Sequence, residues 1–132
     1  MTFYEKFMLD IDKLAARYPY FEMIAVDEDI LQQTTQLHID DRTKCAILAI
    51  DTSMRMQDMV SDDNKDCYVL STDLLSALFY QYLATPFLQH HFQVLTDCVA
   101  KQNELKQQYA ASPDPSLRVI INNIFVAPFS AQ

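Results

Sequence analysis

The most restrictive feature of this sequence is that none of its 132 residues is glycine. Glycine supplies the positive-φ backbone of tight hairpin turns and lets a loop approach a phosphate group closely. The sequence therefore disfavours a phosphate-binding loop, a dinucleotide-binding fingerprint and a fold rich in β-hairpins. Helical architectures can form without glycine, so we expect an all-α protein.

Chain length and charge restrict the number of domains and the class of partner. A chain of 132 residues fits one domain, so we expect a single helical domain over residues 1–132. The net charge of −8 argues against nucleic acid and against charge-driven binding to anionic lipid. Half of the residues are hydrophobic and only 21% are charged, so part of the apolar surplus is expected to cover a partner protein.

The cysteine content and the hydropathy of the chain indicate its cellular compartment. Cys45, Cys67 and Cys98 are odd in number and scattered, which is typical of free thiols in a reducing environment. No apolar run is long enough to span a bilayer, and no basic segment precedes an apolar one at the start of the chain. We therefore expect a soluble, cytoplasmic protein without a transmembrane segment.

Apolar residues at helical spacing, together with cap residues, predict six helices. Thr2 is the expected cap of the first helix, which Pro19 ends, and Asp27 is the expected cap of the second. A strand over residues 45–50 is the alternative for part of the third helix, but its polar residues repeat every three to four positions, which favours a helix. Thr72 and Thr85 are the expected caps of the fourth and fifth helices, with Pro86 as the first residue of the fifth. The expected helices cover residues 3–18, 28–38, 43–60, 72–84, 86–111 and 117–125.

The segment from residue 43 to residue 83 has a characteristic order of elements. An apolar helix with aspartates near its end leads through an acidic link to Val69 and Leu70, which with Asp73 open a second apolar helix. Over roughly residues 43–110, this order resembles the trans-prenyl diphosphate synthases. Within that superfamily it is most similar to component I, the small subunit of bacterial two-component hexaprenyl and heptaprenyl diphosphate synthases. The resemblance implies an antiparallel helix bundle of the isoprenoid synthase type, truncated relative to the catalytic subunit, and a role in isoprenoid and menaquinone biosynthesis.

Catalytic members of this superfamily hold diphosphate through Mg²⁺ on two aspartate-rich segments, and Mg²⁺ requires clustered oxygen ligands. The best match to the first segment is Asp51, and Asp58 lies about 10 Å further along the helix axis, too far to share one ion. Arg55, one turn from Asp51, is expected to neutralise it as an i,i+4 pair. We therefore expect no catalytic residue and no cofactor in this chain. Mg²⁺, the allylic diphosphate and isopentenyl diphosphate are expected on the catalytic partner.

The loop after this helix contains a competing pattern, because residues 62–66 read DDNKD and match a DDxxD string. A continuous helix would place Asp62 and Asp66 on one face, where they could hold Mg²⁺. Ser61 and Asn64 favour a turn instead. A solvated acidic connection is the simpler interpretation. The alternative is a metal site formed by Asp62, Asp63 and Asp66.

The histidines give no metal-site pattern. His90 and His91 are adjacent, so they point in different directions on a helix and cannot chelate one ion together. His91 lies two turns before Cys98 on the same face. We expect a packed histidine beside a buried thiol rather than a zinc site.

The resemblance also indicates an interface, because in this superfamily the two helices after the first aspartate-rich segment join the subunits. These correspond to residues 72–84 and 86–110, whose apolar side chains exceed what one small domain covers. We expect a heterodimer with the large catalytic subunit, in which some interface residues also wall the tunnel for the growing prenyl chain. The predicted interface residues are Leu74, Leu75, Leu78, Phe79, Tyr82 and Phe87.

Two other functions are compatible with the sequence. Acidic, glycine-poor helical proteins also act as secretion chaperones or toxin-neutralising partners, and a small stand-alone Mg²⁺ enzyme using residues 62–66 is the third possibility. A neighbouring gene for a chain with two aspartate-rich motifs favours the synthase, whereas a toxin or effector neighbour favours the chaperone. The sequence leaves open whether the product contains six or seven isoprene units.

Overall fold

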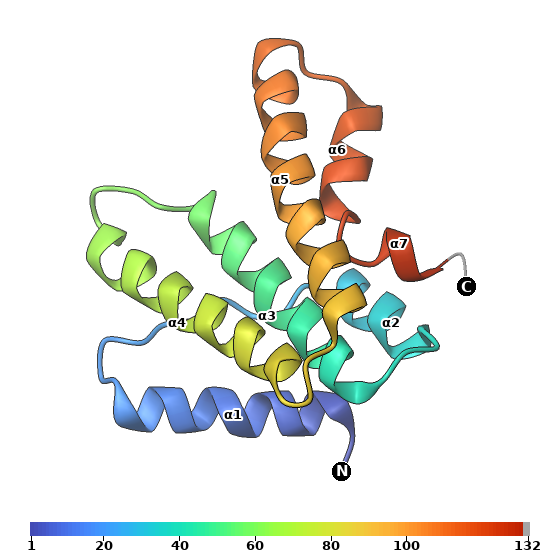
Figure 1. Cartoon of the computed structure of the whole chain (residues 1–132). Coiled ribbons are helices and arrows are strands. Elements are labelled where there is room, and N and C mark those ends of the chain that lie inside the picture. The colour runs from blue at the N-terminus through green and yellow to red at the C-terminus, as the bar shows by residue number, and fades with distance from the viewer. Residues whose placement is uncertain (131–132) are drawn as a thin grey trace.

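The structure, a computed structural model, describes residues 1–130 and consists of helices joined by short loops (Figure 1). The seven helices are α1 (Phe3–Arg17), α2 (Glu28–Gln36), α3 (Asp41–Gln57), α4 (Lys65–Ala84), α5 (Gln89–Ala111), α6 (Pro115–Asn122) and α7 (Ala127–Ser130). Residues 1–130 contain no strand, which confirms the all-α prediction.

Side-chain caps begin α1, α2, α3 and α6 of this glycine-free chain. The Thr2 hydroxyl accepts a hydrogen bond from the Glu5 N–H at 3.1 Å, and the Glu5 carboxylate accepts one from the Thr2 N–H at 3.3 Å, which completes a capping box. Asp27 and Asp40 cap α2 and α3 through N–H groups of the first turn. The predicted caps Thr2 and Asp27 are therefore confirmed. None of the described residues has a positive φ, so their backbone uses no left-handed turn.

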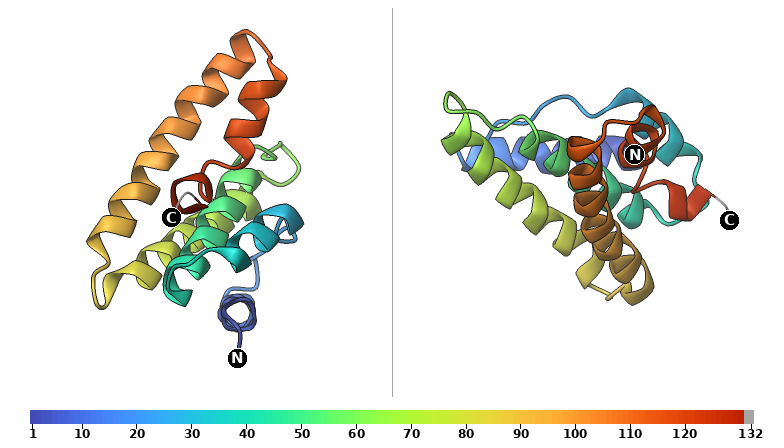
Figure 2. Two further views of the ribbon diagram at one scale, coloured as in Figure 1. Left: turned by 90° about the vertical axis from the view of Figure 1, so that its right-hand side faces the viewer. Right: turned by 90° about the horizontal axis from the view of Figure 1, so that it is seen from above.

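α3 is the central helix of the fold. Every residue from Cys45 to Met54 on it is buried. α4 runs antiparallel along one side of α3, and α1 and α2 also pack directly on it (Figures 1 and 2). The helix prediction for residues 45–50 is confirmed, and the strand alternative is wrong. A helix surrounded by neighbours is apolar over most of its circumference.

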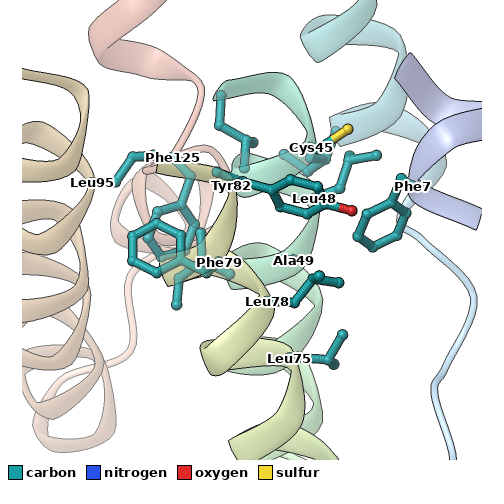
Figure 3. Packing of buried hydrophobic residues seen from close by; sticks show 14 of the residues in the cluster. Phe7, Cys45, Leu48, Ala49, Leu75, Leu78, Phe79, Tyr82, Leu95 and Phe125 are labelled. Carbon is teal, nitrogen blue, oxygen red and sulfur yellow. The ribbon is translucent and has the colours of Figure 1, made fainter. Parts of the chain in front are cut away.

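Side chains from several helices meet around α3 in one hydrophobic core (Figure 3). Phe7 of α1 and Leu75 of α4 are both fully buried against it. On the other side, Leu95 of α5 and Phe125 of the segment after α6 close the core. The chain thus buries a core of its own before any partner binds.

The predicted start of the fourth helix is wrong, because α4 begins at Lys65. Thr72 lies inside the helix, where its hydroxyl donates a hydrogen bond to the Val69 carbonyl at 2.9 Å. The preceding loop is closed by Asn64, whose side-chain oxygen accepts a hydrogen bond from the Ser61 N–H at 2.8 Å. This turn, which the composition of the loop predicts, is tight enough for the helix to start directly after it.

The predicted start of the fifth helix is also wrong, because α5 begins at Gln89 rather than at Pro86. The Leu88 N–H bonds to the Leu83 carbonyl at 2.9 Å, and residues 85–87 form a separate turn between α4 and α5. Arg42 of α3 holds this turn by donating to the Tyr82 carbonyl and the Pro86 carbonyl, both at 2.8 Å. These long-range hydrogen bonds, which local sequence patterns do not reveal, fix the junction.

α5 and α6 form a helical hairpin that projects away from the other helices (Figures 1 and 2). The predicted break at residues 112–115 is confirmed, with Asp114 as cap and Pro115 in the first turn of α6. The predicted helix over residues 117–125 is too long, because α6 ends at Asn122. The Asn123 side chain donates to the Val119 carbonyl at 2.8 Å and so closes the last turn. Pro128, predicted to follow the last helix, lies within α7.

Candidate functional site

The predicted pairing of Asp51 with Arg55 is confirmed. The two side chains lie one turn apart on α3, and the Arg55 Nε donates to the Asp51 Oδ2 at 2.8 Å. Asp51 is 2% exposed, so this carboxylate lies in the core rather than on a polar surface stripe. The helix position that best matches the first aspartate-rich segment of the catalytic synthases therefore carries a buried ion pair.

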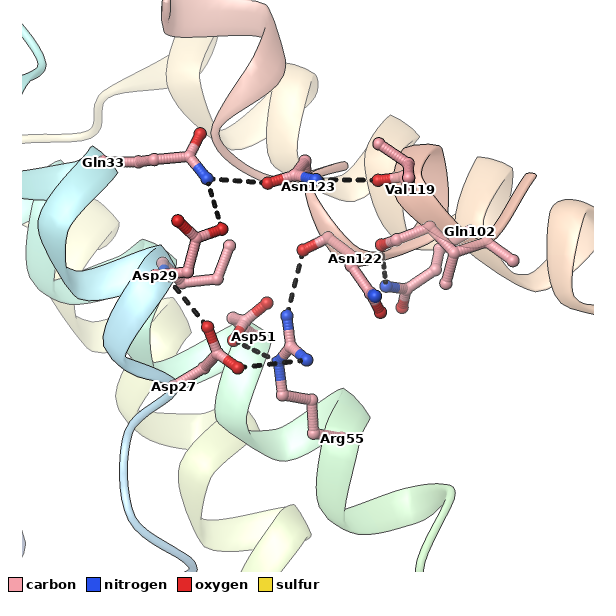
Figure 4. A network of polar contacts seen from close by, with 11 residues as sticks. Asp27, Asp29, Gln33, Asp51, Arg55, Gln102, Val119, Asn122 and Asn123 are labelled. Carbon is pink, nitrogen blue, oxygen red and sulfur yellow. Dashed lines mark hydrogen bonds and ion pairs between the residues drawn. The ribbon is translucent and has the colours of Figure 1, made fainter. Parts of the chain in front are cut away.

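Arg55 connects this position to two other parts of the fold (Figure 4). Its Nη2 donates to the Asn122 carbonyl at the end of α6 at 2.9 Å, and its Nη1 lies 3.6 Å from the Asp27 carboxylate that caps α2. A second link joins α2 to the same region, because the Gln33 Nε2 donates to the Asn123 Oδ1 at 2.7 Å. One guanidinium thus ties α2, α3 and α6 together.

Burial and ion pairing shift the pKa values of Asp51 and Arg55 in opposite directions. Burial raises the pKa of Asp51 above its ordinary value, although Arg55 lowers it in part. Burial alone would lower the pKa of Arg55, but the hydrogen bond and charge of Asp51, together with Asp27, raise it. The arginine stays cationic and is the partner that makes a buried carboxylate tolerable.

The residues around Asp51 do not fit a Mg²⁺ site. The donors of Arg55 occupy the same carboxylate, and a guanidinium at 2.8 Å repels a divalent cation. Asp58, at the end of α3, instead accepts a hydrogen bond from Lys106 Nζ of α5 at 3.0 Å. Within residues 1–130, no three His, Cys, Asp or Glu side chains form a group that could hold a metal ion. Mg²⁺ requires several carboxylate oxygens at one point, and this arrangement does not supply them.

The DDxxD string lies on a turn, not on one helix face. Asp62 and Asp63 are exposed in the turn before α4, and Asp66 is exposed in the first turn of that helix. The helix break therefore removes the i,i+4 arrangement that a shared ion would require. The negative charge of Asp66 is instead placed favourably at the N-terminal end of α4.

His91 makes a different contact from the one expected. Its Nδ1 lies 2.7 Å from the Thr43 hydroxyl, which donates to the Asp40 carboxylate, also at 2.7 Å. Burial would raise the pKa of Asp40, but the hydrogen bonds from Thr43 lower it below its ordinary value. Cys98 instead points its thiol at the Ile124 carbonyl. The three cysteines are free, as predicted.

The predicted interface residues divide into two groups in the structure. Leu74 is half-buried and Phe87 is 56% exposed, so both keep accessible surface in this chain. The other four are buried in this chain's own core, and the Tyr82 hydroxyl donates to the Asp10 carboxylate of α1 (Figure 3). These four are Leu75, Leu78, Phe79 and Tyr82.

Sequence reasoning missed three residues that give α4 its exposed apolar face. Val69, Leu70 and Tyr80 are each about half exposed. The signal was present, because a helix that is apolar all round leaves apolar side chains on its outer face once one side is covered. Where that face should lie could not be derived until the packing of α4 on α3 was known.

Tyr80 belongs to an aromatic cluster at the junction of α4 and α5. Its ring lies 5.7 Å from that of Phe92, and the Phe87 ring lies 5.5 Å from Phe92 on the other side. The buried Phe79 stacks on Phe92 at 6.2 Å and anchors the cluster in the core. Rings held by rigid neighbours lose little entropy on binding and are typical anchors of interfaces.

A cavity of about 280 Å³ opens between α3, α4 and α5 behind this cluster. Ile50 and Met54 of α3 line one side, and Val99 of α5 lines another. Phe79 and Tyr80 form part of its wall, so the aromatic cluster borders both the cavity and the exposed surface. The rest of the lining is polar but uncharged and consists of Gln57, Ser76, Thr96 and Asn103.

None of the described helices is both long and apolar enough to cross a lipid bilayer. The sequence pattern of one protein family matches residues 1–130, and that family is described as hexaprenyl diphosphate synthase, small subunit. The match extends well beyond residues 43–110, the part of the chain in which the order of elements resembles the trans-prenyl diphosphate synthases.

Proposed function

The chain belongs to the family of hexaprenyl diphosphate synthase small subunits, and from this premise we propose that it is the non-catalytic half of a heterodimer. A small subunit implies a second subunit. We place Mg²⁺, the allylic diphosphate and isopentenyl diphosphate on that larger catalytic chain. The observation that carries the proposal is the buried Asp51–Arg55 pair, which stands where a catalytic chain would need free carboxylates.

The outer face of α4 and the aromatic cluster form the proposed contact with the catalytic subunit. Val69, Leu70, Tyr80 and Phe87 lie exposed along one helix and its adjoining turn, and Leu74 borders them. Buried aromatic anchors surrounded by apolar contacts supply most of the affinity in many interfaces. Of the residues first predicted for this role, we propose that Leu74 and Phe87 touch the partner directly. The buried Leu75, Leu78, Phe79 and Tyr82 support them from beneath.

We further propose that the cavity between α3, α4 and α5 contributes to the wall of the product tunnel. Each CH₂ group moved from water to an apolar wall contributes about 0.8 kcal/mol, so a longer product requires a longer dry channel. The apolar side chains of Ile50, Met54 and Val99 suit this role. A second subunit can extend a channel that begins in the catalytic chain.

Product-length analysis of the assembled complex tests this proposal. Ser76 lines the cavity and is half-buried, so Ser76→Phe should fill the space, and we expect shorter prenyl products. Phe79→Ala should enlarge the cavity and lengthen the products, at a stability cost of about 3–5 kcal/mol that makes Ser76→Phe the cleaner variant. Chromatography of the dephosphorylated products measures the distribution.

Ala110→Phe is the matched control, because it adds the same ring at an exposed position near the end of α5, outside the cavity lining. It should leave product length unchanged. An unaltered distribution for Ser76→Phe in a folded, active complex would contradict the tunnel assignment.

A further inference from the structure

A groove between α1 and α4 concentrates positive charge in an otherwise acidic protein. Four of the ten Lys and Arg residues line it, but only one of the eighteen Asp and Glu residues does. The volume of this basic groove is about 480 Å³. Its cationic residues are Lys6, Lys13, Arg17 and Arg42, and its acidic residue is Asp10.

The charges within the basic groove are not equally available to a ligand. Lys6 pairs with Asp10 at 2.8 Å, and Asp10 also accepts the hydroxyl of Tyr82. Arg42 donates to two backbone carbonyls at the end of α4. Lys13 and Arg17 are exposed, and no carboxylate of residues 1–130 lies within ion-pair distance of either. The Arg17 guanidinium lies 5.3 Å from the Tyr18 ring centroid. Lys13 and Arg17 are therefore the cations of the basic groove that are accessible to a ligand.

The α4 side of the basic groove is mainly apolar and continues into the proposed subunit contact. Leu74, Ala77 and Leu78 line it. On a helix, residues three and four apart are neighbours, so Leu74 adjoins Leu70 and Ala77 adjoins Tyr80 on the exposed face of α4. A chain that covers that face therefore reaches the groove directly.

The spacing of the cations indicates the kind of occupant. The two available cations, Lys13 and Arg17, lie one helical turn apart on one face of α1, about 6 Å along its axis. A diphosphate would require several donors that converge on one point, but Lys6 is paired with Asp10 and Arg42 is bonded to two carbonyls. A helical peptide segment with carboxylates three or four residues apart matches the spacing of the two cations, and its apolar side chains match the α4 wall.

We propose that the basic groove is a docking site for an acidic, amphipathic segment of the catalytic subunit. The inference rests on the proposed function, because it assumes that subunit as the partner. In this arrangement, carboxylates of the segment meet Lys13 and Arg17, while its apolar side chains pack on Leu74 and Ala77. The charge pairs set the orientation of the partner and accelerate association, and the apolar face of α4 supplies the affinity.

Charge reversal in the groove tests the docking. For Lys13→Glu/Arg17→Glu, we expect about ten-fold weaker binding of the catalytic subunit at low salt, mostly through slower association, with a smaller loss as salt screens the charges. Lys101→Glu/Arg118→Glu carries the same change in net charge at exposed positions of the projecting hairpin, and should bind nearly as the wild type does. Surface plasmon resonance at two salt concentrations gives both rates, and circular dichroism verifies folding.

The outcomes separate this docking from the proposed function. Unchanged binding of the catalytic subunit by the groove variant, or equal weakening by both double variants, would overturn the docking alone. Failure of the wild-type chain to bind any catalytic subunit would overturn the proposed function and the docking together. Calorimetric binding of inorganic pyrophosphate to the isolated chain, lost in the groove variant while partner affinity is unchanged, would identify a small-anion site instead.

Discussion

Arg55→Met is expected to destabilise the isolated chain by about 3–5 kcal/mol, because it leaves a buried carboxylate without its counter-charge. Asp51 is 2% exposed and accepts from Arg55 at 2.8 Å, so water cannot replace the lost partner without opening the core. The same change releases the Asn122 carbonyl and so loosens α6. Urea denaturation monitored by circular dichroism measures the loss.

The pH dependence gives this prediction a definite sign. Burial already raises the pKa of Asp51, and Arg55→Met removes the hydrogen bond and charge that lower it, so the pKa rises further in the variant. An acid whose pKa is higher in the folded state than in the unfolded state destabilises the fold once the pH exceeds the unfolded value. The loss of unfolding free energy should therefore be small in acid. It should grow as the pH rises from the unfolded pKa of Asp51 to its folded pKa in the variant, and stay constant at higher pH.

Two further variants separate charge from size. Asp51→Asn/Arg55→Met removes both charges and should recover much of the lost stability. Arg118→Met changes an exposed arginine outside the network and should cost little. If Arg55→Met were as mild as Arg118→Met at neutral pH, the Asp51–Arg55 pair would not be the buried support described above.

Tyr80→Ala/Phe87→Ala is expected to weaken binding of the catalytic subunit by about 1,000-fold, because truncating a central aromatic anchor typically costs about 2 kcal/mol and each 1.4 kcal/mol is a factor of ten. Both rings are more than half exposed in the isolated chain, so their removal should change its own stability far less than its affinity. Calorimetry of the two purified chains measures the dissociation constant.

Val119→Ala/Ile120→Ala is the matched control for this effect. These two residues are about as exposed as Tyr80 and Phe87 but lie on α6 in the projecting hairpin. We expect a nearly unchanged dissociation constant for this pair. A larger loss of affinity from Val119→Ala/Ile120→Ala than from Tyr80→Ala/Phe87→Ala would place the interface on the hairpin instead.

Much of the helical content was predictable because the signals are local. Thr2 and Asp27 carry side chains that cap the turn directly after them, and residues 112–115 contain two prolines that break a helix. The pairing of Asp51 with Arg55 was predictable for the same reason, since i,i+4 neighbours on a helix meet whatever the fold. Such inferences require no knowledge of tertiary packing.

The remaining errors come from contacts between distant segments. The turn at residues 85–87 depends on Arg42 of α3, and Asn123 meets Gln33 across 90 positions of sequence. The exposed face of α4 could not be assigned, because a helix that is apolar all round gives no direction until its neighbour is known. Tyr82, a predicted interface residue, lies in the core, where its hydroxyl donates to Asp10.

We propose that this chain lacks its own diphosphate chemistry and acts through a second subunit. Turnover of allylic diphosphate and isopentenyl diphosphate with Mg²⁺ tests this most directly, measured for this chain alone, for its catalytic partner alone and for the equimolar mixture. We expect hexaprenyl-length product from the mixture and none from this chain by itself. Sustained product formation by the isolated chain, or a mixture no more active than the partner alone, would contradict it.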